Sequence, residues 1–192
     1  MSRISFVLLL ASTLCACKGY AEDTSTFYID GETFSVPADN LMPGSVTMLS
    51  STDATGFNFV VYPSSERDQR VFVTIEPRDP LCASARYAVS ALVRNACSGQ
   101  KLRSPNPGLS SIESRVYLDE LRDRWTYGQH DNPFASCFES GTTQIPYSQQ
   151  CFSVGNYKGI IYTLVYPENQ ISRLSEIRHE IESRLSEWNV EK

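Results

Sequence analysis

The sequence predicts an α+β domain, in which an antiparallel β-sheet packs with a C-terminal amphipathic helix and one shorter helix. Residues 56–63 and 71–77 alternate between apolar and other side chains, which is typical of strands that turn one face to a core. Closer to the C-terminus, apolar residues recur every three or four positions and predict a helix with one apolar stripe. The residues of this stripe are Ile171, Leu174, Ile177, Ile181, Leu185 and Trp188. Strands and helices in separate segments indicate the α+β class.

Residues 1–16 have the plan of a secretory signal peptide, because Arg3 precedes an apolar run that ends at Ala16. This run is shorter than the roughly 20 residues that span a bilayer. The stretch 14–17, Leu-Cys-Ala-Cys, resembles the lipobox of bacterial lipoproteins. That resemblance implies cleavage before Cys17, lipidation of Cys17, and a membrane anchor at the periplasmic face of the envelope. A soluble signal peptide, cut after Ala21, is the alternative.

The residue after Cys17 is Lys18 rather than Asp, which in enteric lipoproteins implies sorting to the outer membrane. Residues 17–25 are then a lipidated tether, and residues 26–192 form one α+β domain. Removing the first 16 of the 192 residues leaves 176, enough for one domain with its own core. The formal charge of −5 argues against a nucleic-acid partner, which requires a basic surface.

Four cysteines remain after the proposed cleavage, and an even number in an exported domain indicates two disulfides. Cys137 and Cys151 flank an excursion that can return the chain as a hairpin, so their pairing is expected. Cys82 and Cys97 would lie about 22 Å apart on one continuous helix, too far for a bond. Either the helix ends near residues 94–95 and the chain folds back, so that Cys82 and Cys97 can pair, or these cysteines pair with the other two. We favour the early helix end. No metal site is expected, because Cys-x-x-Cys pairs are absent and histidine is scarce.

The N-terminal half of the domain begins with a hairpin over residues 27–37, where Asp30-Gly31 suits a tight turn between β-formers. The strands at 56–63 and 71–77 are expected to pair antiparallel. Asp79 and Pro80 then open a helix, with Asp at the cap and Pro in the first turn.

Residues 111–127 suit either one helix or two strands, at 115–118 and 124–127, and the β-rich surroundings favour strands. Residues 150–154 and 159–166 are expected to form a hairpin that turns at residues 155–158. In the C-terminal helix, Glu180 and Arg184 are spaced to form an ion pair on the solvent side.

Enzyme signatures are missing: the sequence has no Gly-x-Ser-x-Gly elbow, no phosphate-binding loop and no dinucleotide fingerprint. His179 is expected to be a solvated helix residue, and His130 a polar loop residue. The carboxylate pairs Asp119/Glu120 and Glu180/Glu182 have the composition of solvated faces. The sequence therefore predicts no enzyme, no catalytic residue and no cofactor.

Two segments have the composition of a protein-binding surface. The turn at 64–70 carries charges of both signs, from Glu66, Arg67 and Asp68 among others. The second segment, expected to be a loop from Trp125 to Phe134, combines aromatic and polar groups of the kind enriched in binding hot spots. Its candidate contact residues are Trp125, Tyr127 and His130.

The chain resembles periplasmic immunity lipoproteins of type VI secretion effectors. The resemblance rests on the Ile-Asp-Gly and Phe-x-Val-Pro elements of residues 27–37, on the segment 137–151, on the strand 159–166, and on the closing helix with its late Trp. It implies a protein that binds a toxic secreted effector, such as a lipase or a peptidoglycan hydrolase, and covers the effector's active site. A structural or assembly lipoprotein of an envelope secretion or pilus machine is the alternative.

Overall fold

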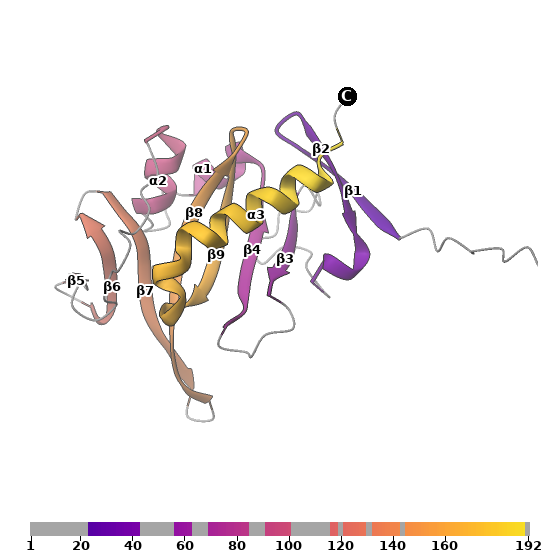
Figure 1. Cartoon of the computed structure of the whole chain (residues 1–192). Coiled ribbons are helices and arrows are strands. Elements are labelled where there is room, and N and C mark those ends of the chain that lie inside the picture. Colours follow the sequence, from indigo (N-terminus) through magenta and orange to yellow (C-terminus); the bar gives the residue numbers. More distant parts are fainter. Residues whose placement is uncertain are drawn as a thin grey trace, which may run out of the picture.

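The computed structural model describes residues 23–42, 56–62, 69–84, 91–100, 116–118, 121–129, 132–142 and 145–190. Over these residues the fold is α+β, as predicted, with two antiparallel sheets (Figure 1). The strands are β1 Thr24–Ile29, β2 Glu32–Pro37, β3 Phe57–Val61, β4 Val71–Ile75, β5 Val116–Leu118, β6 Leu121–Gln129, β7 Asn132–Thr142, β8 Ile145–Tyr157 and β9 Ile160–Pro167. The α-helices are α1 Arg78–Ser84, α2 Ala91–Cys97 and α3 Leu174–Trp188, and the 3-10 turns are η1 Ala38–Asn40 and η3 Glu168–Arg173.

Strands β1 and β2 form the predicted N-terminal hairpin, which is a two-stranded sheet of its own. Asp30 and Gly31 form its turn with φ angles of 50° and 89°, the left-handed pair that a tight hairpin turn requires. The buried side chains of Ile29 and Phe34 belong to the same apolar core as the larger sheet. The Asp-Gly prediction is therefore confirmed in detail.

The larger sheet has seven strands in the order β3-β4-β9-β8-β7-β6-β5, all paired antiparallel. The predicted pairing of β3 with β4 is confirmed. Strands β5 and β6 confirm that the ambiguous segment 111–127 contributes strands rather than one helix.

The hairpin of β8 and β9 is also confirmed, but the predicted position of its turn, residues 155–158, is wrong. Strand β8 continues to Tyr157, and the turn consists of Lys158 and Gly159, both with positive φ. Gly155 lies inside the strand and is buried. A Cβ at this position would lie 1.9 Å from Cζ of Tyr162, so the glycine makes room for a buried ring instead of forming a turn.

Helix α3 lies across one face of the larger sheet and ends beside β2 (Figure 1). Every residue of the predicted apolar stripe is buried, and Ile171 contributes from η3, just ahead of the helix. Among the strand residues facing the helix are Phe59, Val73 and Leu164, which are fully buried. The stripe is thus core. Among the described residues, no helix is both long and apolar enough to cross a membrane.

The short helices α1 and α2 cover part of the opposite face of this sheet, where they pack on Val154 and Ile161. Both predicted disulfides form: Cys82 pairs with Cys97, and Cys137 with Cys151. The expected helix end near residues 94–95 is wrong, because α2 continues through Cys97. The Cα atoms of Cys82 and Cys97 lie 5.8 Å apart because the two cysteines belong to separate helices.

Candidate functional site

The aromatic residues predicted to contact a partner are buried. Trp125 is 1% exposed and Tyr127 is fully buried, because the segment forms strand β6 and turns both side chains toward α3 and η3. The expectation that they line an exposed loop is wrong. The other candidates, Glu66, Arg67, Asp68 and His130, lie outside the described residues, as do Cys17 and the pair Asp119/Glu120.

Trp125 and Tyr127 are hydrogen-bonded in their buried position to an acidic side chain that no local pattern in the sequence reveals. Glu168, at the start of η3, is 4% exposed. The same oxygen of its carboxylate accepts a hydrogen bond of 2.7 Å from Nε1 of Trp125 and another from the hydroxyl of Tyr127. Because a buried carboxylate requires such donors, this acid fixes η3 to β6.

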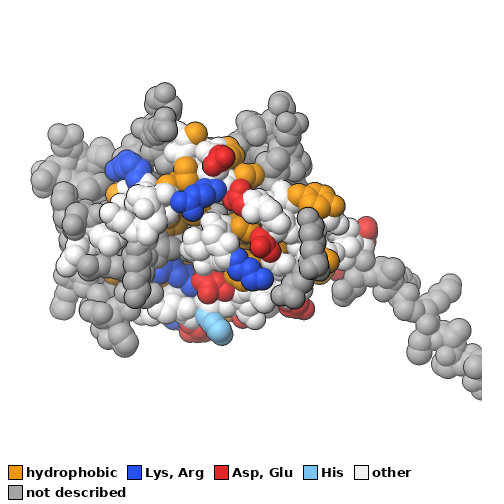
Figure 2. Space-filling model, turned by 90° about the horizontal axis from the view of Figure 1, so that it is seen from above, with side chains coloured by type: hydrophobic (Ala, Val, Ile, Leu, Met, Phe, Trp, Pro, Cys, Tyr) orange, Lys and Arg blue, Asp and Glu red, His pale blue; other side chains and the backbone are white. Residues whose placement is uncertain are grey.

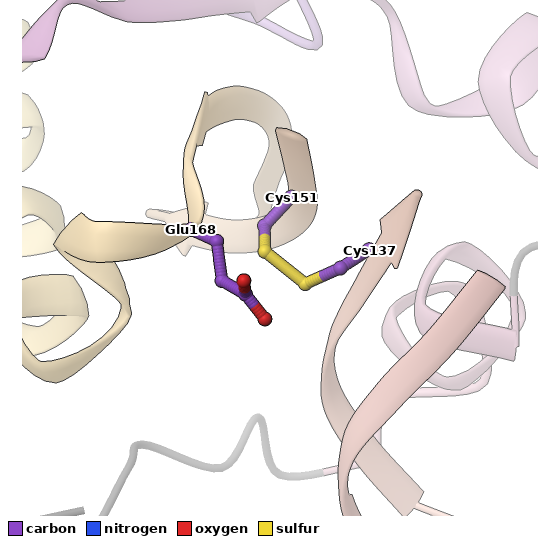
Figure 3. Close-up of side chains that lie close together, drawn as sticks. All are labelled: Cys137, Cys151 and Glu168. Carbon is purple, nitrogen blue, oxygen red and sulfur yellow. A yellow bond between two sulfur atoms is a disulfide. The ribbon is translucent and has the colours of Figure 1, made fainter. Parts of the chain in front are cut away.

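Glu168 also lies beside the disulfide of the sheet (Figure 3). One carboxylate oxygen and the sulfur atoms of Cys137 and Cys151 lie within 4.8 Å of one another, a spacing that could suit a metal ion. The two sulfurs are bonded to each other, however, and a disulfide offers no thiolate ligands. The donor set therefore does not fit a metal in this oxidised state.

A second buried polar group lies in the same layer. The hydroxyl of Ser153 donates to the backbone oxygen of Phe134 and shares a 2.8 Å hydrogen bond with the hydroxyl of Tyr166. Burial raises the pKa of Tyr166 above its usual value. The phenol therefore stays protonated at neutral pH and serves as a structural hydrogen-bonding group.

A group of charged residues lies where the C-terminal end of β3 meets the N-terminal end of α3. Arg173 donates from Nε and Nη2 to both carboxylate oxygens of Glu176, at 3.1 and 2.6 Å, and from Nη1 to Gln170 at 3.0 Å. Its guanidinium carbon lies 5.3 Å from the ring centroid of Tyr62. These hydrogen bonds lower the pKa of Glu176, and burial raises the pKa of Tyr62.

Further along the helix, Arg184 forms the predicted pair with Glu180 at 2.9 Å and also donates to the backbone oxygen of Val60, at 3.4 Å. Tyr62, Arg173, Glu176, Glu180 and Arg184 together are called the α3 corner below. They form two ion pairs in succession along the chain, Arg173 with Glu176 and Glu180 with Arg184, and the ring of Tyr62 stacks on the guanidinium of Arg173.

The backbone of Tyr62 is unusual. Its φ is 60°, a left-handed conformation that costs a bulky residue roughly 1–2 kcal/mol. Tyr62 directly follows β3 and precedes the charged segment 64–70 in the sequence. The α3 corner thus adjoins, along the chain, the segment with Glu66, Arg67 and Asp68 that the sequence predicts as a contact surface.

The surface of the molecule carries both signs of charge. Seen from above, Asp and Glu side chains alternate with Lys and Arg rather than separating into large fields (Figure 2). His179 is exposed on α3, as predicted. Glu182 accepts a 3.0 Å hydrogen bond from Tyr162, whereas Glu180 binds Arg184, so these two carboxylates are engaged with separate partners.

Sequence reasoning missed Tyr62 and Arg173. The three-residue spacing of Arg173 and Glu176 is a signal that could have indicated an ion pair. The positive φ of Tyr62 leaves no trace in the sequence, because most residues with that conformation are Gly, Asn or Asp. Comparison of the chain with protein-family models, with curated proteins and with solved structures finds no match.

Proposed function

We propose that this chain is an envelope-anchored lipoprotein that binds a toxic secreted effector and neutralises it by covering the effector's active site. The proposal assigns the protein to the periplasmic face of the bacterial envelope, held in the outer membrane through Cys17. In this proposal the protein is not an enzyme and uses no cofactor, and its partners are the effector and the membrane.

The observation that carries the proposal is the pair of disulfides in a chain that begins with a lipobox-like segment. Disulfides persist in oxidising compartments, and the signal segment directs a chain to such a compartment. The two features are independent of each other, and both favour the envelope.

Binding is favoured as the mode of action because the α3 corner is ordered by contacts within the chain. Arg173 and Glu176 are 40% and 60% exposed, yet each is held by the other. Side chains that are already fixed lose little entropy when a partner docks, which favours tight binding. A lipid anchor with a short tether would also raise the local concentration of the inhibitor where an envelope toxin acts.

The anchor is tested by expressing the full chain with its own signal segment and analysing the protein by mass spectrometry. A diacylglyceryl group on Cys17, in an outer-membrane fraction, is the expected result. The Cys17→Ser variant is the control and should stay unprocessed. A native protein that is cut after Ala21 and carries no lipid would refute the anchor.

The neutralising function is tested by directing the product of the neighbouring gene to the periplasm of a host cell, with and without this chain. Growth only in the presence of the chain supports the proposal, and equal killing in both strains refutes it. Capture of secretion or pilus components instead of a toxin would favour an assembly role.

The α3 corner is tested in the same rescue assay. Arg173→Glu should weaken binding of the toxin about tenfold or more, as expected for a contact of hot-spot type. Arg94→Glu makes the same charge change at an exposed position of α2, on the opposite face of the sheet, and should leave binding unchanged. Equal affinities of the two variants would place the interface elsewhere.

A further inference from the structure

The two disulfides in the described part of the chain differ in their access to solvent. Cys137 and Cys151 are 1% and 0% exposed, whereas Cys82 and Cys97 are partly exposed. Thiol–disulfide exchange requires a thiolate to reach one sulfur of the bond, so access controls its rate. In the folded state the residues of the Cys82–Cys97 bond are therefore more accessible to a thiolate than those of the Cys137–Cys151 bond.

The surroundings of the buried disulfide add to its protection. Cys137 and Cys151 lie directly opposite each other in one row across the sheet, and their outer neighbours in that row are Trp125 and Tyr166. The carboxylate of Glu168 lies within 4.8 Å of both sulfurs. A negative charge at this distance repels an approaching thiolate and disfavours the thiolates that reduction would release.

The partly exposed Cys82–Cys97 disulfide joins two elements that have little stability of their own. Helices α1 and α2 have seven residues each, which is too short for a helix to persist alone in water. A small apolar cluster attaches them to the sheet, made of Leu81, Leu92, Val93, Ala96, Val154 and Ile161. Arg78 adds two hydrogen bonds, from its backbone nitrogen to Asp30 and from its side chain to the backbone oxygen of Cys97.

We propose that the Cys82–Cys97 disulfide is a thiol-sensitive clasp that holds α1 and α2 on the sheet, and that thiols open it while the Cys137–Cys151 bond stays closed. A thiolate of the reductant attacks one sulfur, the bond between the cysteines breaks, and a mixed disulfide forms. A second thiolate of the reductant then releases that cysteine. The reductant leaves as its own disulfide, and two electrons and two protons remain on Cys82 and Cys97 as thiols.

Opening the clasp has a structural consequence on the outer face of the sheet. Val154 and Ile161 lie under the two helices. Beside them, a row of apolar side chains crosses four strands, with Val60 opposite Phe72, Phe72 opposite Val165, and Val165 opposite Phe152. Phe72 is already 38% exposed. Loosening α1 and α2 therefore extends an apolar surface, so the reduced protein should bind apolar dyes more strongly.

The test exposes the full, folded, oxidised chain to increasing dithiothreitol, traps thiols with an alkylating agent, and assigns each labelled cysteine by peptide mass spectrometry. Cys82 and Cys97 are expected to become labelled at least about a hundredfold faster than Cys137 and Cys151, whose reduction requires the sheet to open. Labelling of all four cysteines at one rate, or of the sheet pair first, would overturn the proposal.

The clasp function is measured separately by hydrogen exchange on the selectively reduced protein and on a Cys82→Ser/Cys97→Ser variant. Amides of α2 should exchange at least about tenfold faster than in the oxidised protein, while amides of β8 and β9 should keep their rates. Unchanged exchange in α2 would overturn the clasp, and the selectively reduced protein answers the question even where the variant fails to fold.

Discussion

Replacing Tyr127 by Phe should lower the free energy of unfolding by about 2 kcal/mol. The change removes one hydrogen-bond donor from the buried carboxylate of Glu168 and keeps the ring, which stacks on Phe134 with centroids 6.2 Å apart. A hydrogen bond to a charged group contributes roughly 1.5–3 kcal/mol, and the loss of packing adds little to this cost because the ring stays in place. The bond from Trp125 remains and keeps the loss near the middle of that range.

A second substitution separates the charge from the hydrogen bonds. In Glu168→Gln, the amide oxygen can still accept from both Trp125 and Tyr127, because the same carboxylate oxygen accepts both bonds in the native protein. These two hydrogen bonds lose their charge assistance, and the expected cost is about 1 kcal/mol. In the double variant the two costs should not add, with a coupling energy of about 1 kcal/mol, because both changes affect one interaction.

Urea unfolding followed by circular dichroism, with the disulfides intact, measures all three variants. Tyr28→Phe is the matched control: Tyr28 is 72% exposed, so loss of its hydroxyl should change stability by less than about 0.5 kcal/mol. If Tyr127→Phe lowers the free energy of unfolding no more than Tyr28→Phe does, the buried carboxylate does not depend on the hydroxyl of Tyr127.

Other predictions concern packing and pH. Gly155→Ala should cost about 1–3 kcal/mol in urea unfolding, because its Cβ would overlap the buried ring of Tyr162, and an unchanged midpoint would refute this. Glu76→Gln should raise the melting temperature at neutral pH. Burial raises the pKa of Glu76, so the folded state disfavours the charge that glutamine lacks. The gain in melting temperature should vanish below the ordinary pKa of a glutamate, where the side chain is neutral in both states. Glu176→Gln should lower the melting temperature at neutral pH, because hydrogen bonds from Arg173 lower the pKa of Glu176 and stabilise its charged form. The stability that Glu176 contributes is present at neutral pH and is lost as the pH falls through the lowered pKa. Melting curves from about pH 3 to pH 8 test both signs, and equal shifts for the two variants would contradict them.

The parts of the fold that depend on local patterns were predictable. Asp30-Gly31 dictates its own turn, and the stripe from Ile171 to Trp188 identifies the helix face that packs on the sheet. The pairing of Cys137 with Cys151 follows from a hairpin between them. Each of these features is decided by residues close together in the sequence.

Features that depend on distant partners were not predictable. Trp125 and Tyr127 have a composition that suits either an exposed loop or a buried strand, and the acid that decides between them, Glu168, lies more than 40 residues away. Local sequence predicts a turn at Gly155, because nothing nearby in the chain reveals the ring of Tyr162 that packs against it. The α3 corner was missed for the same reason, since Tyr62 and Arg173 meet only in the folded chain.

The last described residues complete the first hairpin. The backbone nitrogen of Val190 donates to the oxygen of Thr33 at 2.8 Å, and the side chain of Asn189 donates to Glu32 at 2.6 Å across 157 residues of sequence. Residues 189–190 are synthesised more than 150 residues after β2, so the edge of β2 that they contact stays open during that part of synthesis. Open strand edges attract other chains, so a truncation that ends at Trp188 should aggregate more readily than the chain that keeps residues 189–190.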